Sequence, residues 1–250
     1  MHSRPPVLAR ALPTVRRDAA VAVVLALLII SYGNLISLRP DEVRIDYVWA
    51  FILGNLIFVG LLLAWLIRIE GLSLAAVGLT SENAGRSARM GAILAAVAIT
   101  PVVLFFALSA AVGSGFSRQD IDDTSWGGFF LWAGFKQPVG TSFFEELLFR
   151  GVLLAKMTVA WGQRRALLAS SAVFALWHLV ISYRTIQDTN VASPAGLALV
   201  AILASLLGVF VGALFLGYLR QRTGNLAGSL VFHWLVVVAM SGTLFLMSRG

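Results

Sequence analysis

The sequence contains no cysteine, and only 12% of its 250 residues are charged. Without cysteine, the protein has no disulfide framework, no thiolate metal site and no thiol nucleophile. A soluble domain carries about 25% charged residues, so a chain this poor in charge does not form a water-facing globule. It also does not fit intrinsic disorder, which needs low hydrophobicity, because 59% of the residues are apolar. The composition therefore predicts a membrane protein.

Seven stretches are apolar and long enough to cross a bilayer, which takes about 20 residues. They are residues 19–38, 47–67, 90–112, 127–155, 166–183, 195–219 and 226–247, and Pro138 interrupts the fourth. We therefore predict an all-α fold, a polytopic membrane helical bundle of about seven transmembrane helices. Residues 1–250 are expected to form a single membrane domain. The first stretch is too long for a signal peptide and lacks a clear cleavage site, so we expect a retained anchor.

The basic residues predict the orientation, because Lys and Arg collect in cytoplasmic loops. With the N-terminus inside, 12 of the 19 Lys and Arg residues fall in inner segments and five in outer segments. This distribution predicts a multi-pass protein of the cell membrane with a cytoplasmic N-terminus and an external C-terminus. It also accounts for the net charge of +7 without nucleic acid as a partner. Residues 72–89 are too polar to span and are expected at the inner interface, with a short amphipathic piece as one option.

Ionisable side chains lie inside three of the predicted spans, where they are costly and indicate a functional site by default. They are Glu145, Glu146, Arg150, His178 and His233. A rise of 1.5 Å per helical residue places Glu145, His178 and His233 about 16–20 Å from the nearest inner basic residue. Three helices thus bring a carboxylate and two imidazoles to one layer of the bilayer. Glu146 and Arg150 are four residues apart and are expected to pair, which leaves Glu145 free.

These side chains are suited to hydrolysis without a covalent intermediate. A Glu and a His can activate a water molecule, and a second His can donate to a developing oxyanion. Two alternatives stay open at this point. Glu145, His178 and His233 are also candidate ligands of a divalent metal such as zinc, although the sequence has no HExxH motif. An intramembrane His can equally be a hydrogen-bonded packing residue.

Four segments resemble a known family. Residues 145–150 read EExxxR, residues 174–178 read FxxxH, and a turn containing Thr-Gly leads into the helix that bears His233. Residues 75–86, AAVGLTSENAGR, are similar to the family's interfacial segment. In these motifs the sequence resembles the CPBP intramembrane proteases, also called the ABI family, which include the type II CAAX prenyl endopeptidases. The close resemblance covers residues 143–234, so we expect a CPBP-like catalytic core at residues 140–240.

The resemblance implies an intramembrane endopeptidase that hydrolyses a peptide bond of a membrane-associated protein, which is prenylated in the named activity of relatives. It implies that Glu145 and His178 activate the attacking water and that His233 helps to bind the oxyanion. Glu146 and Arg150 would support the site. The expected partners are a membrane-associated protein or peptide substrate and the lipid bilayer.

One position departs from the family pattern. Val237 stands four residues after His233, where the family commonly has Asn or Asp, and its side chain has no donor or acceptor. Asn225 and Ser229 are the nearby side chains that can compensate. Otherwise the departure favours a non-catalytic scaffold or a bacteriocin self-immunity protein, roles known among relatives. A transporter that uses Glu145 and the two His as a proton relay is a third alternative, weakened because no inverted repeat is evident.

Two further features allow simpler interpretations. Gly208 and Gly212 form a GxxxG motif, for which we expect close helix packing within the fold rather than dimerisation. Trp177 and Trp234 each adjoin a candidate site His and are expected either to pack in the core or to line a substrate groove.

Overall fold

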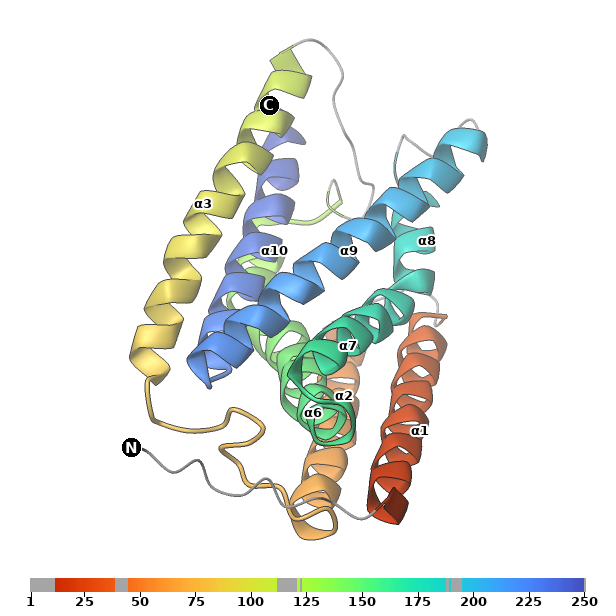
Figure 1. The fold of residues 1–250 in the computed structure, drawn as a ribbon. Coiled ribbons are helices and arrows are strands. Elements are labelled where there is room, and N and C mark those ends of the chain that lie inside the picture. Colours follow the sequence, from red (N-terminus) through yellow and green to blue (C-terminus); the bar gives the residue numbers. More distant parts are fainter. Residues whose placement is uncertain are drawn as a thin grey trace.

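The computed structural model describes residues 12–38, 45–111, 121, 123–187, 189 and 195–249. Almost all of the described chain is helical, and the predicted all-α membrane bundle is confirmed. Figure 1 shows its elements, which in chain order are α1 (Leu12–Ser37), α2 (Ile45–Arg68), α3 (Ala84–Ala111), α5 (Trp126–Leu131), η1 (Trp132–Phe143), η2 (Glu146–Leu153), α6 (Leu154–Trp161), α7 (Gln163–Trp177), α8 (Leu179–Gln187), α9 (Ala195–Thr223) and α10 (Ala227–Met247).

A continuous helical run from Trp126 to Trp161 forms the centre of the bundle. It comprises α5, η1, η2 and α6, and its winding is π-helical in η1 and η2. Pro138 lies inside η1 and does not end the run. π-helical winding is rare, appears mostly as single turns inside α-helices, and is then frequently found at functional sites.

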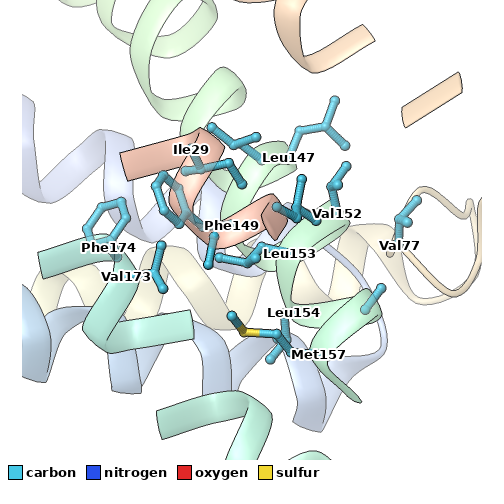
Figure 2. Packing of buried hydrophobic residues seen from close by; sticks show 14 of the residues in the cluster. Ile29, Val77, Leu147, Phe149, Val152, Leu153, Leu154, Met157, Val173 and Phe174 are labelled. Carbon is cyan, nitrogen blue, oxygen red and sulfur yellow. The ribbon is translucent and has the colours of Figure 1, made fainter. Parts of the chain in front are cut away.

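All eight residues of η2 are buried, including Glu146 and Arg150. Leu148, Val152 and Leu153 are fully enclosed, with 0% of their surface exposed. Figure 2 shows this apolar core, in which η2 and α6 meet Ile29 of α1 and Phe174 of α7. Because η2 is wrapped by α1, α2, α7 and α9, its charged side chains avoid lipid, where an unpaired charge is costly.

Helices α3 and α10 lie side by side at one edge of the bundle, opposite α1 (Figure 1). Their backbones nearly touch, because a Cβ atom added at Gly91 would lie 2.1 Å from the carbonyl oxygen of Gly228. The contact also includes a hydrogen bond of 2.9 Å from the Gly228 amide to the Ser87 hydroxyl. Small residues at a helix crossing allow this close approach, which fixes the helix that carries His233.

Four described helical segments are long and apolar enough to cross a membrane: Arg16–Ser37, Ala84–Leu108, Gly196–Thr223 and Ala227–Met247. The bent pair α7 and α8 makes a fifth if it is counted as one span, and Ile52–Arg68 is apolar but shorter. The central run covers the predicted span 127–155, but its charges and its enclosure by other helices set it apart from a lipid-facing span. The predicted number of seven spans is therefore not confirmed.

The outer helices expose apolar side chains to their surroundings. On α1, Leu27 is 60% exposed, and on α9, Leu203 and Leu207 are 58% and 63% exposed. Such faces belong in contact with lipid rather than water, which agrees with a multi-pass membrane protein.

The packing predicted for Gly208 and Gly212 within the fold is wrong, because no described atom lies within 4 Å of a Cβ added at either position.

Lys156, predicted to mark the inner surface, is instead 1% exposed. Its ammonium group lies 2.8 Å from a carboxylate oxygen of Asp18 on α1 and also binds Glu70, which follows α2. Glu70 in turn pairs at 3.0 Å with Arg17 of α1. This ionic cluster of Arg17, Asp18, Glu70 and Lys156 joins α1, α2 and α6 at one end of the bundle.

Other basic residues of the orientation prediction, Arg4, Arg10, Arg39, Arg44 and Arg118, lie outside the described residues.

The interfacial segment, residues 69–83, follows a course of turns with no helix, and residues 84–89 already belong to α3. The separate amphipathic piece considered for residues 72–89 is therefore wrong. Two side chains near the turn between α9 and α10 hold the irregular backbone of residues 69–83 in place by donating hydrogen bonds to its carbonyl groups. Arg220 donates to Ala76 O at 2.8 Å, and Asn225 donates to Thr80 O at 2.6 Å and Glu82 O at 3.0 Å.

Candidate active site

His233 of α10 lies between two consecutive carboxylates of the central run. Its Nδ1 atom is 2.9 Å from Oε1 of Glu146, and its Nε2 atom is 3.8 Å from Oε2 of Glu145. The first distance is that of a hydrogen bond, whereas the second is too long for one. Both acids are enclosed, with 6% of Glu145 and 1% of Glu146 exposed. The sequence predicted that Glu145 and His233 share a layer, but it did not indicate that Glu146 also binds His233.

Arg150 makes the expected pair with Glu146, with Nη1 at 3.1 Å from Oε1. The guanidinium carbon also lies 4.2 Å from the centre of the Phe174 ring, a distance at which the aromatic face attracts a cation. Arg150 is only 3% exposed. The pair with Glu146 and the contact with Phe174 offset part of the cost of burying this charge.

His178 occupies the break between α7 and α8, where its backbone leaves the helical conformation at φ −85° and ψ 5°. Its Nδ1 atom lies 2.9 Å from the carbonyl oxygen of Phe174. A carbonyl can only accept, so Nδ1 carries the proton, and Nε2 of the neutral ring presents a lone pair. The ring also interacts electrostatically with Glu145, His233 and Arg150. His178 therefore belongs to the same cluster and has Nε2 available to accept a proton.

Phe174 connects the charged members of the site. Its ring centre is 4.4 Å from that of His178 and 6.4 Å from that of His233, and its other contacts are Arg150 and Phe149. The sequence indicated Phe174 only as part of the FxxxH spacing, which places it one helical turn before His178. In the fold it is the apolar surface against which both imidazoles and the guanidinium are arranged.

A cavity of about 410 Å³ leads from the interfacial segment to Glu146. It is lined mainly by apolar side chains, and it extends from the exposed Ser81 to the buried Glu146. Oε2 of Glu146 accepts no hydrogen bond from any described residue. The residues around the cavity are Gly78, Leu79, Thr80, Ser81, Ala84, Phe143, Glu146, Leu147, Asn225, Leu226, Ala227 and Leu230.

Asn225 and Ser229, considered above as compensation for Val237, lie at different distances from the site. Asn225 precedes α10, and its amide is engaged by the interfacial segment and by the Ala227 amide, so it does not reach the cluster. Ser229 is fully buried, donates to Leu226 O at 3.1 Å and also interacts with Glu146. Of the two, Ser229 is the one that lies near a site residue.

The two tryptophans next to the site His are engaged elsewhere. Trp177 is 3% exposed and packs against Tyr32, Phe144 and Phe149, which places it in the core. Trp234 donates from its indole nitrogen to the Ala133 carbonyl at 2.8 Å, and thereby ties α10 to η1.

The alternative of a divalent metal depends on how the candidate ligands are grouped. Among the described residues, no group of three or more His, Asp or Glu side chains is arranged to hold a metal ion. Glu145, His178 and His233 were the candidate ligands. Nδ1 of each imidazole is hydrogen-bonded, to Glu146 in His233 and to the Phe174 carbonyl in His178, so Nε2 is the ring nitrogen left to each of them.

Comparison with known families places the cluster within one recognised domain. Residues 126–239 match the family model described as type II CAAX prenyl endopeptidase Rce1-like. The matched range begins at α5, ends in α10 and includes all five candidate site residues. Comparisons with curated proteins and with solved structures found no match.

Proposed function

Residues 126–239 are an Rce1-like domain of a protease family, and from this premise we propose that the chain is an intramembrane endopeptidase. Its substrate would be a membrane-associated protein, prenylated or unprenylated, whose peptide bond is hydrolysed by a water activated by Glu145 and His178. The observation that carries the proposal is the position of His233, which meets both acids of the central run at 2.9 and 3.8 Å.

The first step is attack by water on the carbonyl carbon of the scissile bond. Glu145 is the acid whose carboxylate is not committed to Arg150, so it takes a proton from the water as the C–O bond forms. His178 assists, because the lone pair on its Nε2 atom is available to accept a proton. The carbonyl oxygen thereby becomes an oxyanion.

His233 is the group placed to stabilise that oxyanion. Its Nδ1 proton is committed to Glu146, so donation to the substrate requires a proton on Nε2 as well. Glu146 holds the ring in this orientation, and Arg150 balances the charge of Glu146. When the C–N bond breaks, the proton held by Glu145 and His178 passes to the leaving amine, which completes the hydrolysis.

The cavity beneath the interfacial segment supports a route for water and substrate that reaches Glu146, the neighbour of Glu145. The side chain of Ser81 is exposed, and Glu146 lies at the inner end of the cavity. The last turns of α2 and α9, which carry Arg68 and the pair Arg220 and Arg222, lie toward this side (Figure 1). We propose that this side faces the cytoplasm, with the N-terminus there and the C-terminus outside.

The test is cleavage by the purified protein in lipid nanodiscs, with a farnesylated CAAX peptide and the same peptide without the lipid as probes. Glu145→Gln and His178→Ala are each expected to lower the cleavage rate by about a hundredfold or more. Glu82→Gln, a change at an exposed acid, is the matched control and should cleave at the wild-type rate. Undiminished cleavage by both site variants would overturn the proposal.

One observation favours a second candidate, a non-catalytic membrane scaffold or self-immunity protein. Val237 gives the site no hydrogen-bonding group one helical turn after His233, and loss of one oxyanion donor costs about a hundredfold or more in rate. This alternative predicts that wild-type protein cleaves neither peptide, and that Glu145→Gln leaves the cellular phenotype intact.

A further inference from the structure

The bend that carries His178 contains a broken helical hydrogen bond. Helices α7 and α8 meet at 42°, and in an unbroken helix the Val180 amide would donate to the Leu176 carbonyl four residues earlier. The structure describes both residues, and no direct hydrogen bond between these two groups is present. Such unpaired backbone groups are costly in a membrane unless another group satisfies them.

The side chain of Asn34 on α1 completes the broken bond. Its Nδ2 atom donates to Leu176 O at 3.0 Å, and its Oδ1 atom accepts from the Val180 amide at 3.1 Å. One primary amide thus replaces the missing link between the two helices. A side chain inserted into the helical ladder is a recognised cause of a sharp kink, and here it flanks His178 on both sides.

Two neighbours of Asn34 bring α1 close enough for this insertion. A Cβ atom at Gly33 would lie 2.2 Å from Cε3 of Trp177, so glycine allows α1 to contact the residue just before His178. One turn later, the Ser37 carbonyl accepts from Nη1 of Arg184 on α8 at 2.7 Å. The face of α1 formed by Gly33, Asn34 and Ser37 therefore holds α7 and α8 on either side of the bend.

From this geometry we propose that Asn34 is a positioning residue for His178. It holds the bend at which Nδ1 of His178 donates to Phe174 O, so that Nε2 stays available to accept a proton. Asn34 lies outside residues 126–239, so a segment before the Rce1-like domain completes the site. The proposal rests on the proposed function for its kinetic consequence, but the position of His178 can be measured without any activity.

The structural test is the rate at which diethyl pyrocarbonate modifies His178, measured by mass spectrometry in protein embedded in nanodiscs. Asn34→Leu removes both hydrogen bonds with little change in volume and is expected to change this rate several-fold. His233 in the same protein is the internal reference and should react at its wild-type rate. Ser205→Ala, which removes the 3.1 Å contact with Ser182 of α8, is the matched control and should leave His178 unchanged. An unchanged His178 rate in folded Asn34→Leu protein would overturn the proposal.

The kinetic test is a double-mutant cycle with the farnesylated peptide. Asn34→Leu is expected to lower kcat about tenfold or more, because small misplacement of a reacting group is costly, while KM stays within about twofold. In a His178→Ala background the same change should cause no further loss. An additive loss, as a general packing defect would produce, contradicts the proposal. Wild-type protein that cleaves neither peptide would count against the proposed function, and the His178 modification rate would still decide the role of Asn34.

Discussion

The Nδ1 atom of His233 lies 2.9 Å from Oε1 of Glu146, and the same oxygen lies 3.1 Å from Nη1 of Arg150. One carboxylate oxygen thus connects a base on α10 with a cation of its own helical run. Glu146 is therefore more than the partner of a structural ion pair, since it also fixes which ring nitrogen of His233 faces Glu145. Glu146 therefore has two contributions that can be measured separately: one to stability, through Arg150, and one to activity, through His233.

Glu146→Gln is expected to leave Arg150 buried without its counter-charge and to lower the stability by about 3–5 kcal/mol. Activity is expected to fall as well, because His233 loses its charged partner. Glu146→Gln combined with Arg150→Met removes both charges and should recover most of the stability but none of the activity. Thermal unfolding in nanodiscs and peptide cleavage measure the two effects. If the double variant regained activity, Glu146 would have only a structural role.

Leu230→Trp is expected to fill the cavity between the interfacial segment and Glu146 with little effect on folding. Leu230 lines the cavity on α10 and is only half-buried, so a larger ring has room to enter it. Cleavage should fall about tenfold, mainly through KM, if the substrate enters there. Leu207→Trp, at a residue of α9 that is 63% exposed, is the control. Equal kinetics in the two variants would show that substrate takes another route.

Lys156→Met is expected to destabilise the protein by about 3 kcal/mol, because it leaves the partly buried Asp18 and Glu70 carboxylates without their shared, buried cation. The control Arg165→Met replaces an exposed cation one helix further on and should leave the unfolding temperature unchanged. Thermal unfolding followed by tryptophan fluorescence distinguishes the two variants. Equal unfolding temperatures would mean that the ionic cluster does not hold α1 and α2 against α6.

Strong chelators such as EDTA and 1,10-phenanthroline are expected to leave cleavage unchanged, because the site His and Glu do not form a ligand group. The assay should compare treated wild-type protein with treated protein to which zinc is added back. Loss of activity on chelation and its return with zinc would show that the water is activated by a metal instead.

Hydropathy and charge together predicted much of this fold. The apolar stretches became helices, although α1 and α3 begin six or seven residues before their expected starts and the fifth stretch is split into α7 and α8. Glu145 and His233, expected in one layer, lie 3.8 Å apart. Spacing also paired Glu146 with Arg150, since a four-residue separation keeps two side chains on neighbouring parts of a helix surface in either winding. These features depend on local sequence alone.

The same reasoning could not predict which side chains of different helices come into contact. The hydrogen bond of His233 to Glu146 depends on how α10 is rotated against η2, and no spacing within one helix encodes that rotation. Lys156 looked like a surface marker because its two acidic partners come from α1 and the segment after α2. Asn34 stands out in the sequence as a polar amide within an apolar span. Its partners could not be predicted, because they are backbone groups of Leu176 and Val180 that become unpaired only where α7 bends into α8.

The π-helical winding of η1 and η2 makes the site respond unequally to insertions and deletions. Each π turn holds one more residue than an α turn. One residue deleted between Trp132 and Phe143 can therefore be absorbed by rewinding a single π turn of η1 as an α turn, and Glu145 would still face His233. An insertion in the same segment has no such turn to absorb it and would rotate the side chains beyond it by about 100° relative to those before it, so insertions should be confined to the loops.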